Sequence, residues 1–123
     1  MRIERDILGT KKLSDDAAYG INTVRAAENF DLCHKKTNMR LIYAVVQVKK
    51  AAAITYRDMQ VREPGIYEAI LSACDEILAG KYDAAFITEA LQGGAGTSVN
   101  MNVNEVVANA ALRILGKPYG KYD

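Results

Sequence analysis

Three stretches of the chain place apolar residues at three- and four-residue spacing, which is the repeat of one face of an α-helix. The clearest stretch lies near the C-terminus and consists of Val103, Val106, Val107, Ala110, Ala111 and Ile114. Gly116 and Pro118 follow it, and that order is typical of the end of a helix. The repeat constrains the chain to a mainly α fold.

Two further helices are predicted upstream. Asn38 can cap a helix from Met39 to Met59. Pro64 suits the first turn of the next helix, and Gly80 suits its end. The apolar residues of the first helix are Leu41, Ile42, Val45, Val48, Ala52 and Thr55, and those of the second are Ile66, Ile70, Ala73 and Ile77.

The first 38 residues show no such repeat. Turn-forming residues at 9–10 and 14–16 predict an irregular N-terminal segment with short strands. Residues 21–24 suggest no more than a short extended strand, and from 23 to 30 helical and extended conformations compete. Residues 82–91 fit either a helical turn or a strand.

The composition is that of one ordinary globular domain, spanning residues 1–123. Half of the 123 residues are hydrophobic and 25% are charged, which permits a core without disulfides or a metal. The formal net charge is +1 and the charges are interspersed, so neither nucleic-acid binding nor a polybasic membrane anchor is expected.

The chain reads as cytoplasmic. No apolar run approaches the ~20 residues of a membrane span, and the start, residues 1–6, is too charged for a secretory signal. Cys33 and Cys74 lack the spacing of a zinc or redox pair, so we expect two buried or half-buried thiols and no metal site. The single histidine, His34, is expected at the surface or beside a helix.

The segment Gln92–Glu105 is the candidate functional site. Gly93, Gly94 and Gly96 allow a ligand to approach the backbone, and the N–H groups of the following helix start favour an anion. The sequence therefore predicts a cradle for a carboxylate or phosphate. The alternative is that Thr97 or Ser98 only caps the helix. Three amides at alternate positions, Asn100, Asn102 and Asn104, favour the cradle, because asparagine is a poor helix former.

Two nucleotide-binding motifs are excluded by residue identity. A P-loop requires a lysine after its last glycine, and none is present. A dinucleotide fingerprint requires a third glycine where Val99 stands.

The same segment carries a family resemblance. Residues 92–109, QGGAGTSVNMNVNEVVAN, closely resemble the N-terminal region of the aspartase/fumarase superfamily, and residues 2–6, 18–30 and 48–53 are similar to it as well. Ala95 and the Thr97-Ser98 pair resemble the aspartase branch. Class II fumarases, the second choice, typically carry serine and glutamine at the positions of Ala95 and Ser98.

The resemblance implies the N-terminal domain of a longer lyase that converts L-aspartate reversibly to fumarate and ammonia without a cofactor. It implies that Thr97 donates to a substrate carboxylate and that Gly96, Ser98 and Asn100 line the same site. Arg25 matches an arginine associated with activation in some aspartases, although a surface ion pair with Glu28 is an equal alternative.

The resemblance also implies what residues 1–123 do not contain. In the superfamily, the serine loop that supplies the general base and the histidine-bearing segments lie beyond the equivalent of Asp123, and the active sites form in a homotetramer. We therefore expect no catalytic residue within this chain and no activity from it alone. A different class of function, a standalone assembly module without enzyme activity, stays open.

Overall fold

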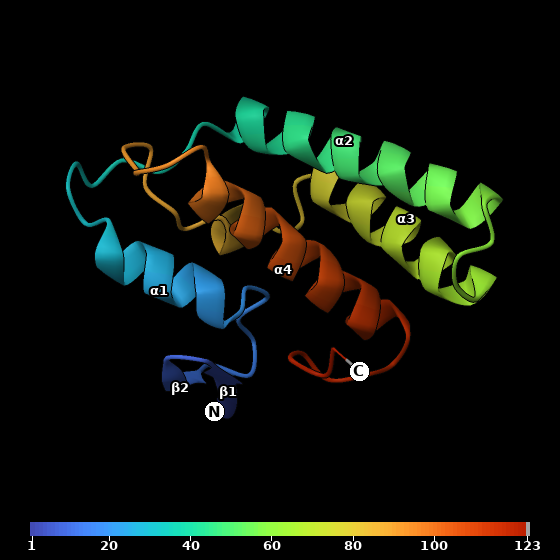
Figure 1. Ribbon diagram of the computed structural model, residues 1–123, viewed down its shortest axis with the longest axis horizontal. Coiled ribbons are helices and arrows are strands. Elements are labelled where there is room, and N and C mark those ends of the chain that lie inside the picture. The colour runs from blue at the N-terminus through green and yellow to red at the C-terminus, as the bar shows by residue number, and fades with distance from the viewer. Residues whose placement is uncertain (123) are drawn as a thin grey trace.

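The computed structural model describes residues 1–122, and helices dominate it as the sequence predicts (Figure 1). The chain opens with an antiparallel hairpin in which Arg2 lies opposite Leu13. In order, the elements are strands β1 (Arg2–Asp6) and β2 (Gly9–Leu13), helices α1 (Ile21–Asn29), α2 (Met39–Asp58) and α3 (Pro64–Leu78), the 3₁₀ turn η1 (Asp83–Ala85) and helix α4 (Thr97–Ile114). The predicted short-strand N-terminal segment followed by helices is confirmed.

Helix α4 is the centre of the fold. It packs against α1 on one side and against α2 and α3 on the other (Figure 1). The apolar stripe predicted for it is buried from Val103 to Ala111, and Ile114 is exposed at its end. Burial of each such valine contributes about 1.5–3 kcal/mol. The ends of α4 are therefore held in place by its well-packed middle.

Helix α2 begins as predicted, because the Asn38 side chain accepts a hydrogen bond from the N–H of Arg40. Its predicted buried face is partly wrong. Leu41 and Val48 are 52% and 67% exposed, whereas Ile42 and Val46 are fully buried. The helix carries apolar residues on two faces, and only packing decides which is covered. Although α2 has 20 residues, neither it nor another helix within residues 1–122 is long and apolar enough to cross a membrane.

Helix α3 has the predicted ends. Pro64 occupies its first turn, and Gly80 follows its last residues with φ of +86°, a conformation that favours glycine. Ala73 and Ile77 of the predicted stripe are fully buried, while Ile66 is exposed near the start.

The short extended strand suggested for residues 21–24 is wrong, because these residues form the start of α1. The N–H group of Ile21 donates to Glu4 Oε2 at 2.8 Å, and that of Thr23 donates to Glu105 Oε2 at 3.0 Å. Carboxylates distant in sequence thus satisfy the first N–H groups of this helix, which local patterns cannot reveal.

The ambiguous segment 82–91 resolves into the η1 turn followed by extended chain. The N–H of Thr37 donates to the carbonyl of Thr88 at 3.0 Å, and the N–H of Ala90 donates to that of Lys35 at 2.7 Å. A bridge between Lys36 and Glu89 completes this pairing. The connection between α1 and α2 therefore lies beside the segment that leads into the glycine-rich loop.

Candidate functional site

The glycine-rich loop ends where α4 begins, as the anion-cradle interpretation requires. Gly96 is the N-cap residue, with φ of +80° in the left-handed region that favours glycine. Thr97 is the first helical residue. Neither Thr97 nor Ser98 caps the helix through its side chain, so the alternative prediction of a hydroxyl cap is wrong.

A side chain from outside the helix satisfies part of this helix start. Gln92 Oε1 accepts a hydrogen bond from the N–H of Val99 at 3.0 Å. Within residues 1–122, the N–H groups of Thr97 and Ser98 have no such acceptor, and the first turn of α4 holds no acidic side chain. These two donors, at the positive end of an 18-residue helix, are free to bind an anion.

The loop is held against the end of α1. A Cβ atom at Gly93 would lie 3.2 Å from ring carbons of Phe30, closer than ordinary contact. Glycine at this position therefore lets the backbone approach the aromatic ring. The start of the loop is also fixed to the segment that precedes it, because Gln92 Nε2 donates to the carbonyl of Glu89 at 2.5 Å.

The three amides do not form one ligand-facing stripe. Asn102 is fully buried, and its side chain accepts from the N–H of Ile87 at 3.1 Å and donates to the carbonyl of Ala85 at 3.0 Å. Asn104 is half-buried, with its Nδ2 3.7 Å from Met101 Sδ. Successive alternate positions of a helix point about 200° apart. Asn102 therefore has a structural role, and the inference that all three amides bind a ligand is wrong.

The sequence-predicted site residues occupy the loop and the first turn of α4. Thr97 is exposed, Gly96 and Asn100 are half-buried, and Ser98 is buried. Ser98 lines a surface hollow of about 600 Å³ together with Arg25, Phe30 and Leu8. The structure thus brings Ser98 and Arg25 to one depression, between α1 and the start of α4.

Arg25 is already paired within this depression. Its Nε lies 2.6 Å from Asp6 Oδ2, and a second guanidinium nitrogen lies 2.8 Å from Asp6 Oδ1. These hydrogen bonds raise the pKa of Arg25 and lower that of Asp6. The alternative prediction of an ion pair with Glu28 is wrong, because Glu28 pairs with Lys11. Asp6 is the last residue of strand β1. Helical spacing does not predict its contact with Arg25, because Asp6 lies outside the helix.

Sequence reasoning missed Glu105, the residue that fixes α4 to α1. Its carboxylate accepts from the N–H groups of Gly20, Asn22 and Thr23 and from the Thr23 hydroxyl. Glu105 is 7% exposed. A signal was present, since Glu105 lies three and four positions from Asn102 and Asn109, which are also buried.

The thiols and the histidine lie as predicted. Cys74 is buried and Cys33 is half-buried. Burial raises the pKa of the Cys74 thiol to about 11, so it stays protonated at neutral pH. His34 is a surface residue between α1 and α2.

Comparison with known proteins agrees with the fold. A family model described as lyase matches residues 9–121. The chain belongs to this lyase family and corresponds to the N-terminal domain of the aspartase/fumarase superfamily. It is 49% identical over 121 residues to the aspartate ammonia-lyase of Bacillus subtilis, covering 98% of this chain and 26% of that protein.

Solved structures give the same relationship. The fumarate lyase:delta crystallin of Brucella melitensis superposes with a TM-score of 0.95 at 45% identity, covering 99% of this chain and 28% of the other. The class II fumarase of Schistosoma mansoni superposes with a TM-score of 0.88 at 32% identity, covering 95% and 25%. The chain spans about a quarter of the length of the relatives that it matches.

Proposed function

We propose that the chain is the N-terminal domain of an aspartate ammonia-lyase and supplies one wall of its dicarboxylate site. The observation that carries this proposal is the free helix start at Thr97 and Ser98, preceded by the glycine-rich loop. The 49% identity to an aspartate ammonia-lyase supports the choice of substrate. The backbone N–H groups and the Thr97 hydroxyl bind a carboxylate of L-aspartate, with Gly96, Ser98 and Asn100 lining the site.

The reaction removes ammonia from L-aspartate. A base takes the proton from C3, the C2–N bond breaks with its electron pair leaving on the amine, and the C2=C3 double bond of fumarate forms. Negative charge develops on the carboxylate next to C3 before the amine leaves. Donors fixed at a helix start stabilise such a charge without reorganising. The chain contributes such donors at the start of α4.

The base and the remaining walls of the site belong to the rest of the protein under this proposal. The complete enzyme is a cytoplasmic homotetramer that needs no redox cofactor, and Arg25 serves an activator site beside the cradle. Residues 1–123 alone have no lyase activity, because they bind one end of the substrate and do not abstract its proton.

The test is a substrate comparison with the protein translated from the complete reading frame that contains residues 1–123. Fumarate formation, followed by its absorbance, is expected from L-aspartate and not from L-malate. Fumarate from L-malate would instead identify a fumarase, for which the similarity to the Schistosoma mansoni enzyme is the supporting observation. Activity on neither substrate would favour an assembly module.

The inactivity of the isolated chain is tested in the same assay. The 123-residue polypeptide is expected to form no fumarate from L-aspartate above background. Turnover by it would show that the chain contains its own base, and the division of the site proposed here would be wrong.

A further inference from the structure

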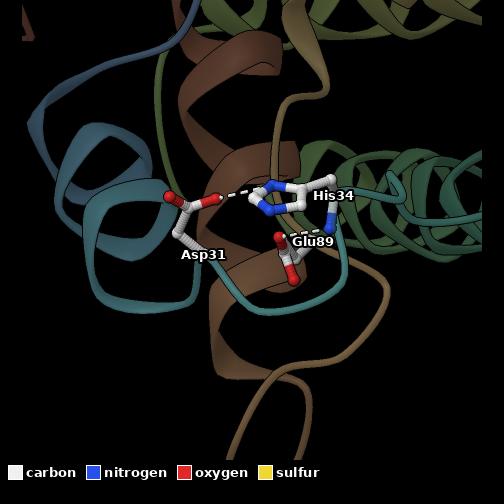
Figure 2. A group of neighbouring side chains, drawn as sticks. All are labelled: Asp31, His34 and Glu89. Atoms are coloured by element: carbon white, nitrogen blue, oxygen red, sulfur yellow. Dashed lines mark hydrogen bonds and ion pairs between the residues drawn. The ribbon is translucent and has the colours of Figure 1, made fainter.

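We propose that Asp31, His34 and Glu89 bind one divalent transition-metal ion such as Zn²⁺, independently of the proposed function. One possible ligand atom from each residue lies within 4.8 Å of the others. Figure 2 shows the His34 ring beside the Asp31 carboxylate, to which a dashed line joins it, with the Glu89 side chain below the ring. His34 and Glu89 are 55 positions apart in the sequence, so the fold itself assembles this group.

Glu89 is the fixed member of the group. It is 8% exposed, and its carboxylate accepts hydrogen bonds of 2.9 Å from the N–H groups of Leu32, Cys33 and His34. The N–H group of Cys33 makes the largest contribution, and together these hydrogen bonds hold the pKa of Glu89 at about 2. Among residues 1–122, no lysine, arginine or terminal amine forms an ion pair with it. Glu89 is therefore held in place by the backbone of residues 32–34 and, within residues 1–122, has no cationic side chain paired with it.

Asp31 and His34 are the adjustable members. Their side chains are 70% and 77% exposed, with His34 Nδ1 3.0 Å from Asp31 Oδ1. In a tetrahedral site with metal–ligand bonds of ~2.1 Å, ligand atoms are separated by about 3.4 Å. Rotation of two exposed side chains is enough to close the group to that size. Exposure also leaves the fourth position to water.

The donor set decides which class of ion fits. One imidazole nitrogen and two carboxylate oxygens match the ligand preferences of Zn²⁺ and Co²⁺, whereas Mg²⁺ and Ca²⁺ take oxygen ligands almost entirely. Two carboxylates neutralise a dication when His34 binds in its neutral form.

A bound ion would be linked to the glycine-rich loop through the hydrogen bonds of Glu89. The carbonyl of Glu89 accepts from Gln92 Nε2 at 2.5 Å and from Thr37 Oγ1 at 3.1 Å. Gln92 in turn accepts from Val99 in the first turn of α4. The ion therefore ties the connection before α2 to the segment that positions the anion cradle.

The test is a titration of the 123-residue chain with ZnCl₂, followed by the imidazole ¹⁵N signals. The chain has one histidine, so these signals report on His34 alone. We expect a saturable shift at one equivalent and a thermal midpoint that rises with Zn²⁺ concentration. His34→Asn removes the imidazole and tolerates the φ of +53° at this position. His34→Asn and Asp31→Asn should each weaken binding at least ~10-fold.

Two variants serve as controls. Asp16→Asn changes an exposed carboxylate outside the group, and Cys33→Ser removes the neighbouring thiol; both should bind Zn²⁺ as the parent does. Unshifted imidazole signals at saturating Zn²⁺, or equal affinity of His34→Asn and the parent, would overturn the proposal. Loss of binding in Cys33→Ser would contradict the assigned ligand set.

Discussion

The first turn of α4 and the middle of the same helix use polar side chains in opposite ways. In the first turn, Thr97 is exposed and no side chain of the helix caps its N–H groups. In the middle, Asn102, Glu105 and Asn109 are buried and hold backbone groups of other segments. Asn109, for example, donates to the carbonyl of Ala18 at 2.7 Å and accepts from the N–H of Gly120 at 2.9 Å.

The difference lets α4 serve as scaffold through its middle and, under the proposed function, as a binding element at its start. Buried polar groups are stable only when they are hydrogen-bonded, so those of the middle fix the position of α4. Free groups at the start cost little because solvent reaches them, and they stay available to a ligand. Substitutions in the middle should therefore reduce stability, and substitutions at the start should reduce activity.

Glu105→Ala should have the largest effect on stability. It removes the acceptor of five hydrogen bonds from Gly20, Asn22 and Thr23. Leaving buried donors unpaired should cost about 3 kcal/mol or more in the free energy of unfolding, measured with urea. Glu28→Gln, an exposed carboxylate paired with Lys11, should cost less than ~1 kcal/mol. Equal losses would contradict the structural role assigned to the buried carboxylate of Glu105.

Thr97→Ala should reverse this pattern. In the complete enzyme we expect kcat/KM for L-aspartate to fall roughly 100-fold, as for loss of one donor to a developing anion. The free energy of unfolding of the chain should change by less than ~0.5 kcal/mol, because Thr97 is exposed. Thr97→Ser keeps the hydroxyl and should retain most activity. Unchanged turnover in Thr97→Ala would show that the role assigned to this residue is wrong.

Asn102→Ala and Asn100→Ala form a matched pair of the same residue type. Asn102→Ala removes the partners of Ile87 and Ala85 and should lower the free energy of unfolding by about 1–3 kcal/mol. Asn100→Ala should lower the free energy of unfolding by no more than ~0.5 kcal/mol, because Asn100 is half-buried in the first turn. Urea denaturation of both variants checks this, and a larger loss in Asn100→Ala would place the boundary between scaffold and site elsewhere.

The smallest expected effect is a difference between the alkylation rates of the two thiols in the unsubstituted chain. Cys74 packs in the core with Val103 and Val106, and its pKa of about 11 keeps it protonated at pH 8. Iodoacetamide at pH 8 should therefore modify Cys33 first and Cys74 only after unfolding, as peptide mass spectrometry can show. Modification of both at one rate would mean that this side of α4 opens readily.

The local signals predicted most helix ends and the position of the loop. Asn38, Pro64, Gly80 and Gly116 lie where their backbone preferences place them at helix ends. Predictions that required a choice between faces were less accurate, as Leu41 and Val48 show. Helical spacing identifies an apolar face but not its neighbour, and α2 has two such faces.

Long-range contacts explain the remaining errors. The sequence predicts a strand at the start of helix α1 and does not decide between helix and strand for residues 23–30, because Glu4 and Glu105, from strand β1 and helix α4, accept the first N–H groups of α1. Arg25 pairs with Asp6 instead of Glu28 because the hairpin brings Asp6 to α1. No pattern within a few residues contains either contact.

The sequence by itself determined the mainly α fold, the family and a glycine-rich loop that leads into a helix, because these depend on local periodicity, backbone preference and residue identity. Only the tertiary structure decided which polar residues of α4 face the core and which face solvent. It also brought Glu89 beside Asp31 and His34, where a lone histidine in the sequence gave no reason to expect a metal site. Burial and contact are properties of the packed chain, and they give identical side chains different roles.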